Sequence, residues 1–395
     1  MSNRFFFAVF SSAVLSLGTA AGQSPTFSYT QLDYPGAKST SASGVNARGD
    51  IVGFYTDQAD TTHGFLLSKG IFTTIDYPDA LGTQALGINA RGDIVGTQGS
   101  NFDIGQAGGD VHGFLLRAGA SNPEPIDYPG HLNTIAQRIT DSGQVLGSYH
   151  DRDTMATMHG FLLDKGGYTA LDGTENGVDM PATMNNGGTP DGTVIAGLFT
   201  DMMTNLTRGY VLNGSTFTPF DVPGSTATAA WDINPTGAIV GNYTDSAGET
   251  HGFLEVNGAF SAIDYPGGTA TRPRGINPQG ELVGIYAASD GSTHGFLLSG
   301  PPAVVITGGP RETVDRRHIY LDASGSTSTA GNTPLTYHWA SQNYLASIFG
   351  QDTATPEIVL APLEMDFVFQ VTVTDSKGNS STDSITVLLT NPNQF

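Results

Sequence analysis

The sequence contains no cysteine, so disulfide bonds cannot contribute to its stability. Basic residues are also scarce: 16 Lys and Arg stand against 37 Asp and Glu, which gives a formal net charge of -21. A negative field of this size repels phosphate backbones and anionic membrane surfaces. We therefore expect no nucleic-acid partner, and the composition leaves cations, basic surfaces and neutral glycans as partners.

Apolar runs of membrane length are missing as well, because none reaches the roughly 20 residues that a spanning helix needs. The run from Phe5 to Leu17 follows one arginine and precedes small residues through Gly22, which is the layout of a secretory signal peptide. We expect residues 1–22 to direct export; a buried strand or a short anchor is the alternative. An exported chain without cysteine fits a bacterial protein that is secreted, periplasmic or at the cell surface.

What the sequence does have is glycine, with 52 residues, and an internal repeat. A His-Gly-Phe phrase recurs at intervals of 43 to 49 residues, starting at His63, His112, His159, His251 and His294, with Arg208 in the remaining place. An Asp-Tyr-Pro phrase follows it in the same order, at Asp33, Asp76, Asp127, Asp221 and Asp264, with a degenerate copy at Asp172. Six copies at one period indicate a structural repeat.

Each repeat unit predicts four short strands, which in the second unit are "TQALGIN", "GDIVGT", "HGFLL" and "GIFTTID". Turn sequences such as "NARG" and "NPQG" join the first two strands. The second and third strands are apolar at nearly every position, which favours burial on both faces. We expect the glycines of the second strands to let neighbouring sheets approach closely; these are Gly53, Gly96, Gly147, Gly241 and Gly284.

Four strands in a period of this length are typical of a β-propeller blade. A lone fourth strand, "FSYTQLD", precedes the first unit, and the sixth unit stops after its third strand at Leu298. The sequence therefore predicts an all-β, six-bladed β-propeller over residues 27–299, closed by the N-terminal strand. The units resemble the HAF-type extracellular repeat of exported bacterial proteins, a resemblance that implies an architecture and no particular activity.

Beyond the repeat, residues 303–390 predict an antiparallel β-sandwich of the immunoglobulin-like kind. The phrases "LDASGST", "LTYHW" and "FQVTVTDSKGNSSTDSITV" are similar to PKD-type modules. The Trp-Asp-Phe-Gly-Asp-Gly phrase of that family is absent, because "ASQN" follows Trp339. The resemblance implies a spacer or weak binder attached to the propeller.

The repeated histidines are not predicted to bind a metal, because equivalent residues of six blades lie around a ring and do not converge on one ion. We expect them to bond to neighbouring backbone and fix a loop. Loop carboxylates at Asp57, Asp245 and Asp290 leave calcium open as a ligand, and no other cofactor is expected.

No catalytic motif is present, and no catalytic residue is assigned. Four acidic residues break the repeat, and we interpret them as solvated loop residues: Asp103, Asp110, Glu175 and Asp179.

A ligand site is expected where the repeat varies, in the first strands that line the channel of a propeller. Alignment on the "GIN" phrase puts Ser43, Leu86, Gln137, Thr183, Trp231 and Arg274 in one column, and Gly44, Gly87, Arg138, Met184, Asp232 and Gly275 in the next. An aromatic face beside guanidinium groups can stack on a sugar ring or hold a carboxylate. The predicted ligand-binding residues are Trp231, Arg272, Arg274, Arg138 and Asp232. The alternative is that Trp231 only fills the channel.

These observations favour an exported, monomeric, non-catalytic binding or adhesion protein whose partner is a glycan or another cell-surface molecule. A polysaccharide-active hydrolase or lyase on a propeller scaffold is the first alternative. A purely structural envelope protein is the second.

Overall fold

In a computed structural model, the chain is described at residues 28–99, 111–131, 133–150, 158–175, 178–180, 183–201, 204, 206–300, 304–307, 311–328, 334–342, 345–376, 378–391 and 393. The predicted signal peptide lies outside these residues, as do Asp103 and Asp110. All regular elements of the described part are β-strands. No helix in it is long and apolar enough to cross a membrane.

The repeat region forms six antiparallel four-stranded sheets in the described residues, named A to F here in chain order. Sheet A contains β2 (Ser39–Val45), β3 (Ile51–Thr56), β4 (Thr62–Ser68) and β5 (Ile71–Ile75). Sheet B contains β6 (Thr83–Ile88), β7 (Ile94–Gly99), β8 (Val111–Leu116) and β9 (Glu124–Ile126). Sheet C contains β10 (Asn133–Ile139), β11 (Val145–His150), β12 (Met158–Asp164) and β13 (Gly167–Ala170).

The other three sheets follow the same order. Sheet D contains β16 (Thr183–Gly188), β17 (Val194–Asp201), β18 (Leu206–Asn213) and β19 (Thr216–Phe220). Sheet E contains β20 (Ala227–Ile233), β21 (Ile239–Thr244), β22 (Thr250–Val256) and β23 (Ala259–Ile263). Sheet F contains β24 (Ala270–Ile276), β25 (Leu282–Ala287), β26 (Thr293–Ser299) and β1 (Ser28–Leu32). A small hairpin, β14 (Gly173–Glu175) and β15 (Val178–Met180), lies between sheets C and D in the sequence.

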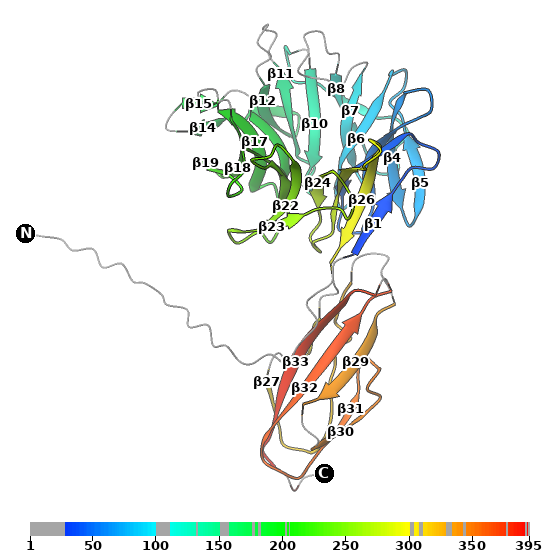
Figure 1. Cartoon of the computed structure of the whole chain (residues 1–395), viewed down its shortest axis with the longest axis vertical. Helices are drawn as coiled ribbons and strands as arrows, with labels where there is room; N and C mark the ends of the chain where they lie inside the picture. Colours follow the sequence, from blue (N-terminus) through cyan, green and yellow to red (C-terminus); the bar gives the residue numbers. More distant parts are fainter. Residues whose placement is uncertain are drawn as a thin grey trace, which may run out of the picture.

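The six sheets pack side by side in a propeller-like ring (Figure 1). Each sheet contacts the next, from β3 against β6 through to β21 against β24, and β25 of sheet F returns to β2 of sheet A. The N-terminal strand completes sheet F, because β1 pairs antiparallel with β26 from Ser28 opposite Ser299 to Leu32 opposite Gly295. This pairing confirms the predicted closure by the N-terminal strand.

The repeated "Ile-Asn" phrase has a structural cause at the turn between the first two strands of a sheet. The side-chain oxygen of Asn46 accepts hydrogen bonds from the backbone N–H groups of Arg48 and Asp50, while its Nδ2 donates to the carbonyl of Asn89 in the next sheet. Asn277 makes the closing link, donating to the carbonyl of Asn46 at 3.2 Å. One asparagine thus shapes a turn and joins two sheets.

Each sheet also buries one large aromatic ring from its third strand in the core; the six are Phe65, Phe114, Phe161, Tyr210, Phe253 and Phe296. In sheet A this ring lies over Gly53 of the paired strand, where an added Cβ would meet it at 2.8 Å and would also overlap the carbonyl oxygen of Ser41. Both contacts are within sheet A. The prediction that the second-strand glycines let neighbouring sheets approach is therefore wrong: they make room for parts of their own sheet.

The C-terminal part forms two further sheets, apart from the ring in Figure 1. One contains β27 (Arg311–Val314), β33 (Ser380–Leu389), β32 (Asp366–Thr374) and β29 (Thr336–Ser341). The other contains β28 (His318–Tyr320), β31 (Glu357–Leu360) and β30 (Ala346–Phe349). Trp339 is buried in the core of this part, and its indole N–H donates to the carbonyl of Thr353. The core side chains alternate along β32 and β33, as expected for strands that bury one face.

Candidate functional site

The first strand of every sheet carries a β-bulge next to the centre of the ring. The extra residues, each skipped in the pairing with the second strand, are Ser43, Leu86, Gln137, Asn186, Trp231 and Arg274. This column agrees with the predicted one except in sheet D, where Asn186 replaces Thr183 and Gly187 replaces Met184. The prediction was three residues out because Gly188 stands in sheet D where the other five first strands have a valine or isoleucine.

The residues that follow the bulges form the tightest part of the ring, and four of them are glycine: Gly44, Gly87, Gly187 and Gly275. A Cβ added to Gly87 would lie 2.9 Å from the Cα of Arg138, and one added to Gly44 would lie 3.0 Å from the carbonyl oxygen of Leu86. These glycines therefore let neighbouring sheets come close. The two exceptions in the column are Arg138 in sheet C and Asp232 in sheet E.

Arg138 reaches across the ring and binds backbone of three other sheets. Its Nη1 donates to the carbonyls of Leu86 and Gln137, at 2.5 and 3.1 Å, and its Nη2 donates to those of Ser43, at 2.9 Å, and Arg274. All four carbonyls belong to bulge residues, which a strand ladder leaves without a regular partner. Buried carbonyls need donors, and one guanidinium supplies several in a plane.

Asp232 provides the opposite charge from the fifth sheet. Its Oδ2 lies 3.5 Å from Nε of Arg138, and its carboxylate also accepts hydrogen bonds from the backbone N–H groups of Ile276 and Ile233. Both side chains are buried. Burial raises the pKa of Asp232 above its ordinary value, and the charge of Arg138 opposes that rise. The pair joins sheets C and E through the centre of the ring.

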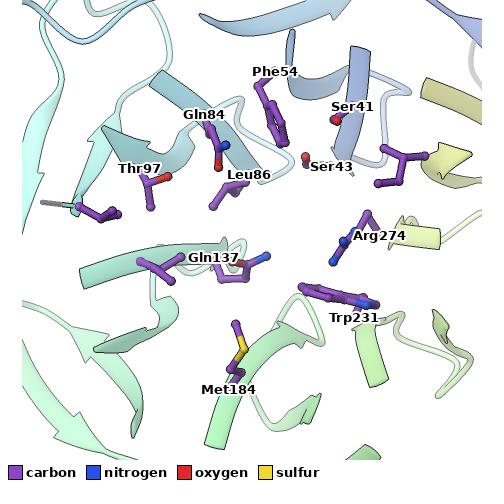
Figure 2. Close-up of a pocket in the computed structure, with 13 residues that line it drawn as sticks. Ser41, Ser43, Phe54, Gln84, Leu86, Thr97, Gln137, Met184, Trp231 and Arg274 are labelled. Carbon is purple, nitrogen blue, oxygen red and sulfur yellow. The ribbon is translucent and has the colours of Figure 1, made fainter. Parts of the chain in front are cut away.

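A wider pocket of about 280 Å³ lies in the centre of the ring, lined by the first strands and by some residues of the second and third strands (Figure 2). Its walls combine short polar side chains and apolar ones: Ser41, Ser43, Gln84, Thr97 and Gln137, with Phe54, Leu86, Val111, Ile135, Met184 and Ile285. Trp231 and Arg274 complete the lining. Among the described residues that line it, Arg274 is the one charged group. The volume is close to the lower end, about 300 Å³, of the usual range for ligand pockets.

Trp231 and Arg274 form one wall of this pocket, projecting from neighbouring strands β20 and β24 (Figure 2). The guanidinium carbon of Arg274 lies 3.5 Å from the centroid of the indole ring, a cation–π arrangement. The indole N–H donates to Oδ1 of Asn242 at 2.7 Å, which holds the ring in place. Trp231 thus occupies part of the centre of the ring and also presents a surface to the pocket.

Arg272 lies two residues before Arg274 on β24, and both side chains are partly exposed. Burial lowers the pKa of Arg274 to about 9, and the positive charges of Arg272 and Arg138 act in the same direction. In the part of the chain that the structure describes, no carboxylate forms an ion pair with Arg272 or Arg274. The arginines therefore give this wall a positive charge that described side chains leave uncompensated.

The five predicted ligand-binding residues fall into two groups. Trp231 and Arg274 line the wide pocket, with Arg272 next to them on the same strand as Arg274. Arg138 and Asp232 line a separate cavity of about 60 Å³ toward the turns. Asn186 was missed, although its Oδ1 is buried without a hydrogen-bond partner in the described residues and its Nδ2 donates to the carbonyl of Ala230. The pairing register of β16 with β17 in sheet D, which skips Asn186, is the observation that identifies it.

The repeated histidines pair with the repeated aspartates. His63 places Nδ1 2.9 Å from Asp76 and Nε2 3.6 Å from Asp57, and its ring stacks on Tyr55. Equivalent pairs are His112 with Asp127, His159 with Asp172, Arg208 with Asp221, His251 with Asp264 and His294 with Asp33. The predicted backbone partner was wrong, since a carboxylate takes that place.

The proposed calcium carboxylates hold their own loops. Oδ1 of Asp57 accepts backbone hydrogen bonds from Ala59 and Thr61, and these lower the pKa of its carboxyl. Asp245 and Asp290 accept equivalent bonds from their loops. Among the described residues, no group of three or more histidines and carboxylates is placed to hold a metal ion. Calcium binding at these loops stays a prediction.

Comparison with known proteins identifies the C-terminal part. Residues 308–389 match a protein-family model described as a PKD domain, as the phrases of the sequence predicted. No curated protein matched the chain.

Solved structures similar to the chain include the β-propeller domain of the trilobed protease from Pyrococcus furiosus, at 9% identity and TM-score 0.41, covering 65% of this chain and 78% of that one. A protein of unknown function from Dyadobacter fermentans has 14% identity and TM-score 0.45, covering 68% and 98%. The Aleuria aurantia lectin has 12% identity and TM-score 0.42, covering 66% and 91%.

Proposed function

We propose that the protein is an exported, non-catalytic binding protein that holds a glycan in the wide pocket of its ring. In this proposal residues 1–22 are a signal peptide removed on export, and residues 27–299 form a closed six-bladed β-propeller of HAF-like repeats. Residues 303–390, which include the PKD match, act as a spacer or second contact at a bacterial cell surface. The mature protein works as a monomer.

One observation carries the proposal: the wall formed by Trp231 and Arg274. Aromatic faces pack on the apolar face of a sugar ring, and a guanidinium beside the ring donates to its oxygens. The serine, threonine and glutamine side chains around the pocket supply further neutral donors and acceptors. An apolar lining with a few convergent polar groups is the usual composition of a small-molecule site.

The lining also supports binding rather than hydrolysis. Most glycosidases act with two carboxyl groups on either side of the scissile bond. The described residues that line the wide pocket include no aspartate or glutamate. A hydrolase or lyase on this scaffold would therefore need its acids from another part of the ring.

A glycan panel tests the proposal. Binding of the purified full chain is measured by titration calorimetry, and reducing ends or unsaturated products are assayed in the same mixtures. We expect binding without turnover, and Trp231→Ala should weaken it by about 1–3 kcal/mol, as for a central hot-spot residue. Reproducible turnover that maps to one acidic residue would favour the enzyme instead. Affinity unchanged in Trp231→Ala, with the fold intact by circular dichroism, would place the site elsewhere.

A further inference from the structure

The wide pocket has a charge opposite to that of the whole protein. The chain carries a formal net charge of -21, yet the one charged group among the described lining residues is Arg274, with Arg272 beside it and Arg138 beyond. Arg138 has Asp232 as its counterion, whereas the other two have none among the described residues. Fields of exposed charges decay over about 8 Å at physiological salt, so a ligand in the pocket experiences mainly these nearby arginines.

We propose that the glycan held in this pocket is acidic, with a carboxylate bound by Arg274 and Arg272 and its sugar ring against Trp231. This inference rests on the proposed function and adds the chemical class of the ligand. A planar guanidinium and a carboxylate can form two parallel hydrogen bonds, which gives both orientation and affinity.

The guanidinium of Arg274 is available for this role. It stacks on Trp231, and it donates no hydrogen bond to any residue that the structure describes. Arg138 differs, because its two terminal nitrogens are used by four backbone carbonyls. The structure therefore separates one arginine that holds the ring together from one whose donors face a cavity.

A carboxylate would also relieve the crowding of like charges. Arg272 and Arg138 both act electrostatically on Arg274, and partial burial of its side chain removes water that would screen them. A bound anion supplies the missing counterion within the pocket. A neutral sugar satisfies the hydroxyl and amide groups of the wall and leaves the two arginines as they are.

The test compares matched acidic and neutral saccharides on the full chain. Oligomers of glucuronate, galacturonate and mannuronate are titrated calorimetrically beside their methyl esters, which keep the ring and lose the charge. We expect at least one acid to bind, with its ester at least tenfold weaker. Arg274→Gln should lower the affinity for the acid to that of the ester and leave the ester nearly unchanged. Arg311→Gln, an exposed arginine of the C-terminal part, is the matched control.

Two more variants keep the test decisive. Arg274→Lys keeps the charge without the planar pair of donors, so its affinity for the acid should fall between those of the parent and Arg274→Gln. If Arg274→Gln fails to fold, Arg272→Gln tests the second arginine. Acid and ester of equal affinity, or neutral glycans bound in preference, would overturn this inference and leave the glycan-binding function standing. Absence of binding to any acidic or neutral saccharide would overturn both.

Discussion

Replacing Arg138 with methionine should open the centre of the ring. Methionine has nearly the same length, but it supplies no hydrogen-bond donor and no charge. The carbonyls of Ser43, Leu86, Gln137 and Arg274 would lose their shared donor, and Asp232 would lose its counterion inside a buried site. Three other sheets lose backbone bonds and sheet E loses an ion pair, so the change should affect the whole ring.

The size of the effect follows from the buried pair. Removing one partner of a buried ion pair costs about 3–5 kcal/mol, because the remaining charge stays uncompensated. Loss of the carbonyl contacts acts in the same direction, although water entering the neighbouring cavity of about 60 Å³ would restore some of them. A loss of this size should lower the melting temperature of the ring by roughly 6–20 °C.

Protonation of Asp232 should reduce the loss of stability that Arg138→Met causes. Burial already raises the pKa of Asp232, and loss of Arg138 removes the charge that opposes the rise. A carboxyl whose folded pKa is raised favours the folded state at low pH, and this contribution is lost as the pH rises through the folded pKa. The variant should therefore be closest to the parent at low pH and should lose more stability as the pH rises.

Scanning calorimetry of the full chain measures both effects, with Arg311→Gln as the control. The double variant Arg138→Met/Asp232→Asn should recover part of the stability at pH 7, since no charge is then left buried without a partner. A single variant that melts within about 2 °C of the parent at pH 7 would show that the ring does not depend on Arg138. A loss that stays constant from acidic to alkaline pH would refute the role given to Asp232.

Three further predictions concern packing, closure and charge. Gly87→Ala should lower the free energy of unfolding by about 1–3 kcal/mol, because its Cβ would lie 2.9 Å from backbone of the next sheet. The control Gly70→Ala meets no atom within 4 Å and should lose only about 1 kcal/mol, because Gly70 has a positive φ. Equal shifts of the melting temperature in the two variants would contradict this packing role. Deleting residues 28–32 should expose the edge of β26 and cause aggregation or loss of the cooperative transition, so an unchanged calorimetric trace would contradict the closure. Because the pKa of Arg274 is lowered to about 9, binding of an acidic saccharide should weaken as the pH rises through about 9 while binding of its ester stays level; a flat profile for the acid contradicts the role of the charged guanidinium.

The ring itself could be read from the sequence because its signals are local and repeated. Strand patterns, turn residues and the spacing of the His-Gly-Phe phrase all recur, and the pairing of β1 with β26 follows from counting strands. The reasons behind individual residues were harder to predict. Gly53 is required because the ring of Phe65 and the carbonyl of Ser41, both in its own sheet, leave no room for a side chain. His63 pairs with the carboxylate of Asp76, thirteen residues further along the chain. Sequence spacing does not reveal such cross-strand partners.

The column of first-strand residues could be predicted from the sequence in most sheets, whereas the contacts of its side chains could not. A β-bulge shifts the register by one residue, so the side chains on either side of it cannot be assigned to a face by simple alternation. Trp231 and Arg274 were placed in the correct column, and their stacking at 3.5 Å could not be foreseen. Thr183 and Met184 were assigned to the positions that Asn186 and Gly187 occupy, because sheet D has a divergent first strand. Arg138 was predicted to bind a ligand from its place in the variable column, and its bonds to backbone in distant parts of the chain could not be foreseen.

Departures from the repeat occur at two levels of the ring, one that holds the sheets together and one that carries the proposed recognition site. The bulge in each first strand leaves a carbonyl without a regular ladder partner, and Arg138, paired with Asp232, donates to several of these carbonyls. Arg138 of sheet C and Asp232 of sheet E stand where the other four sheets have glycine. Trp231 in sheet E and Arg274 in sheet F lie one residue earlier, in the column of bulge residues, and both line the wider pocket. Arg138 and Asp232 join the sheets through backbone hydrogen bonds and an ion pair. Substitutions in the pocket wall can therefore change the ligand that the pocket binds without disrupting the ring.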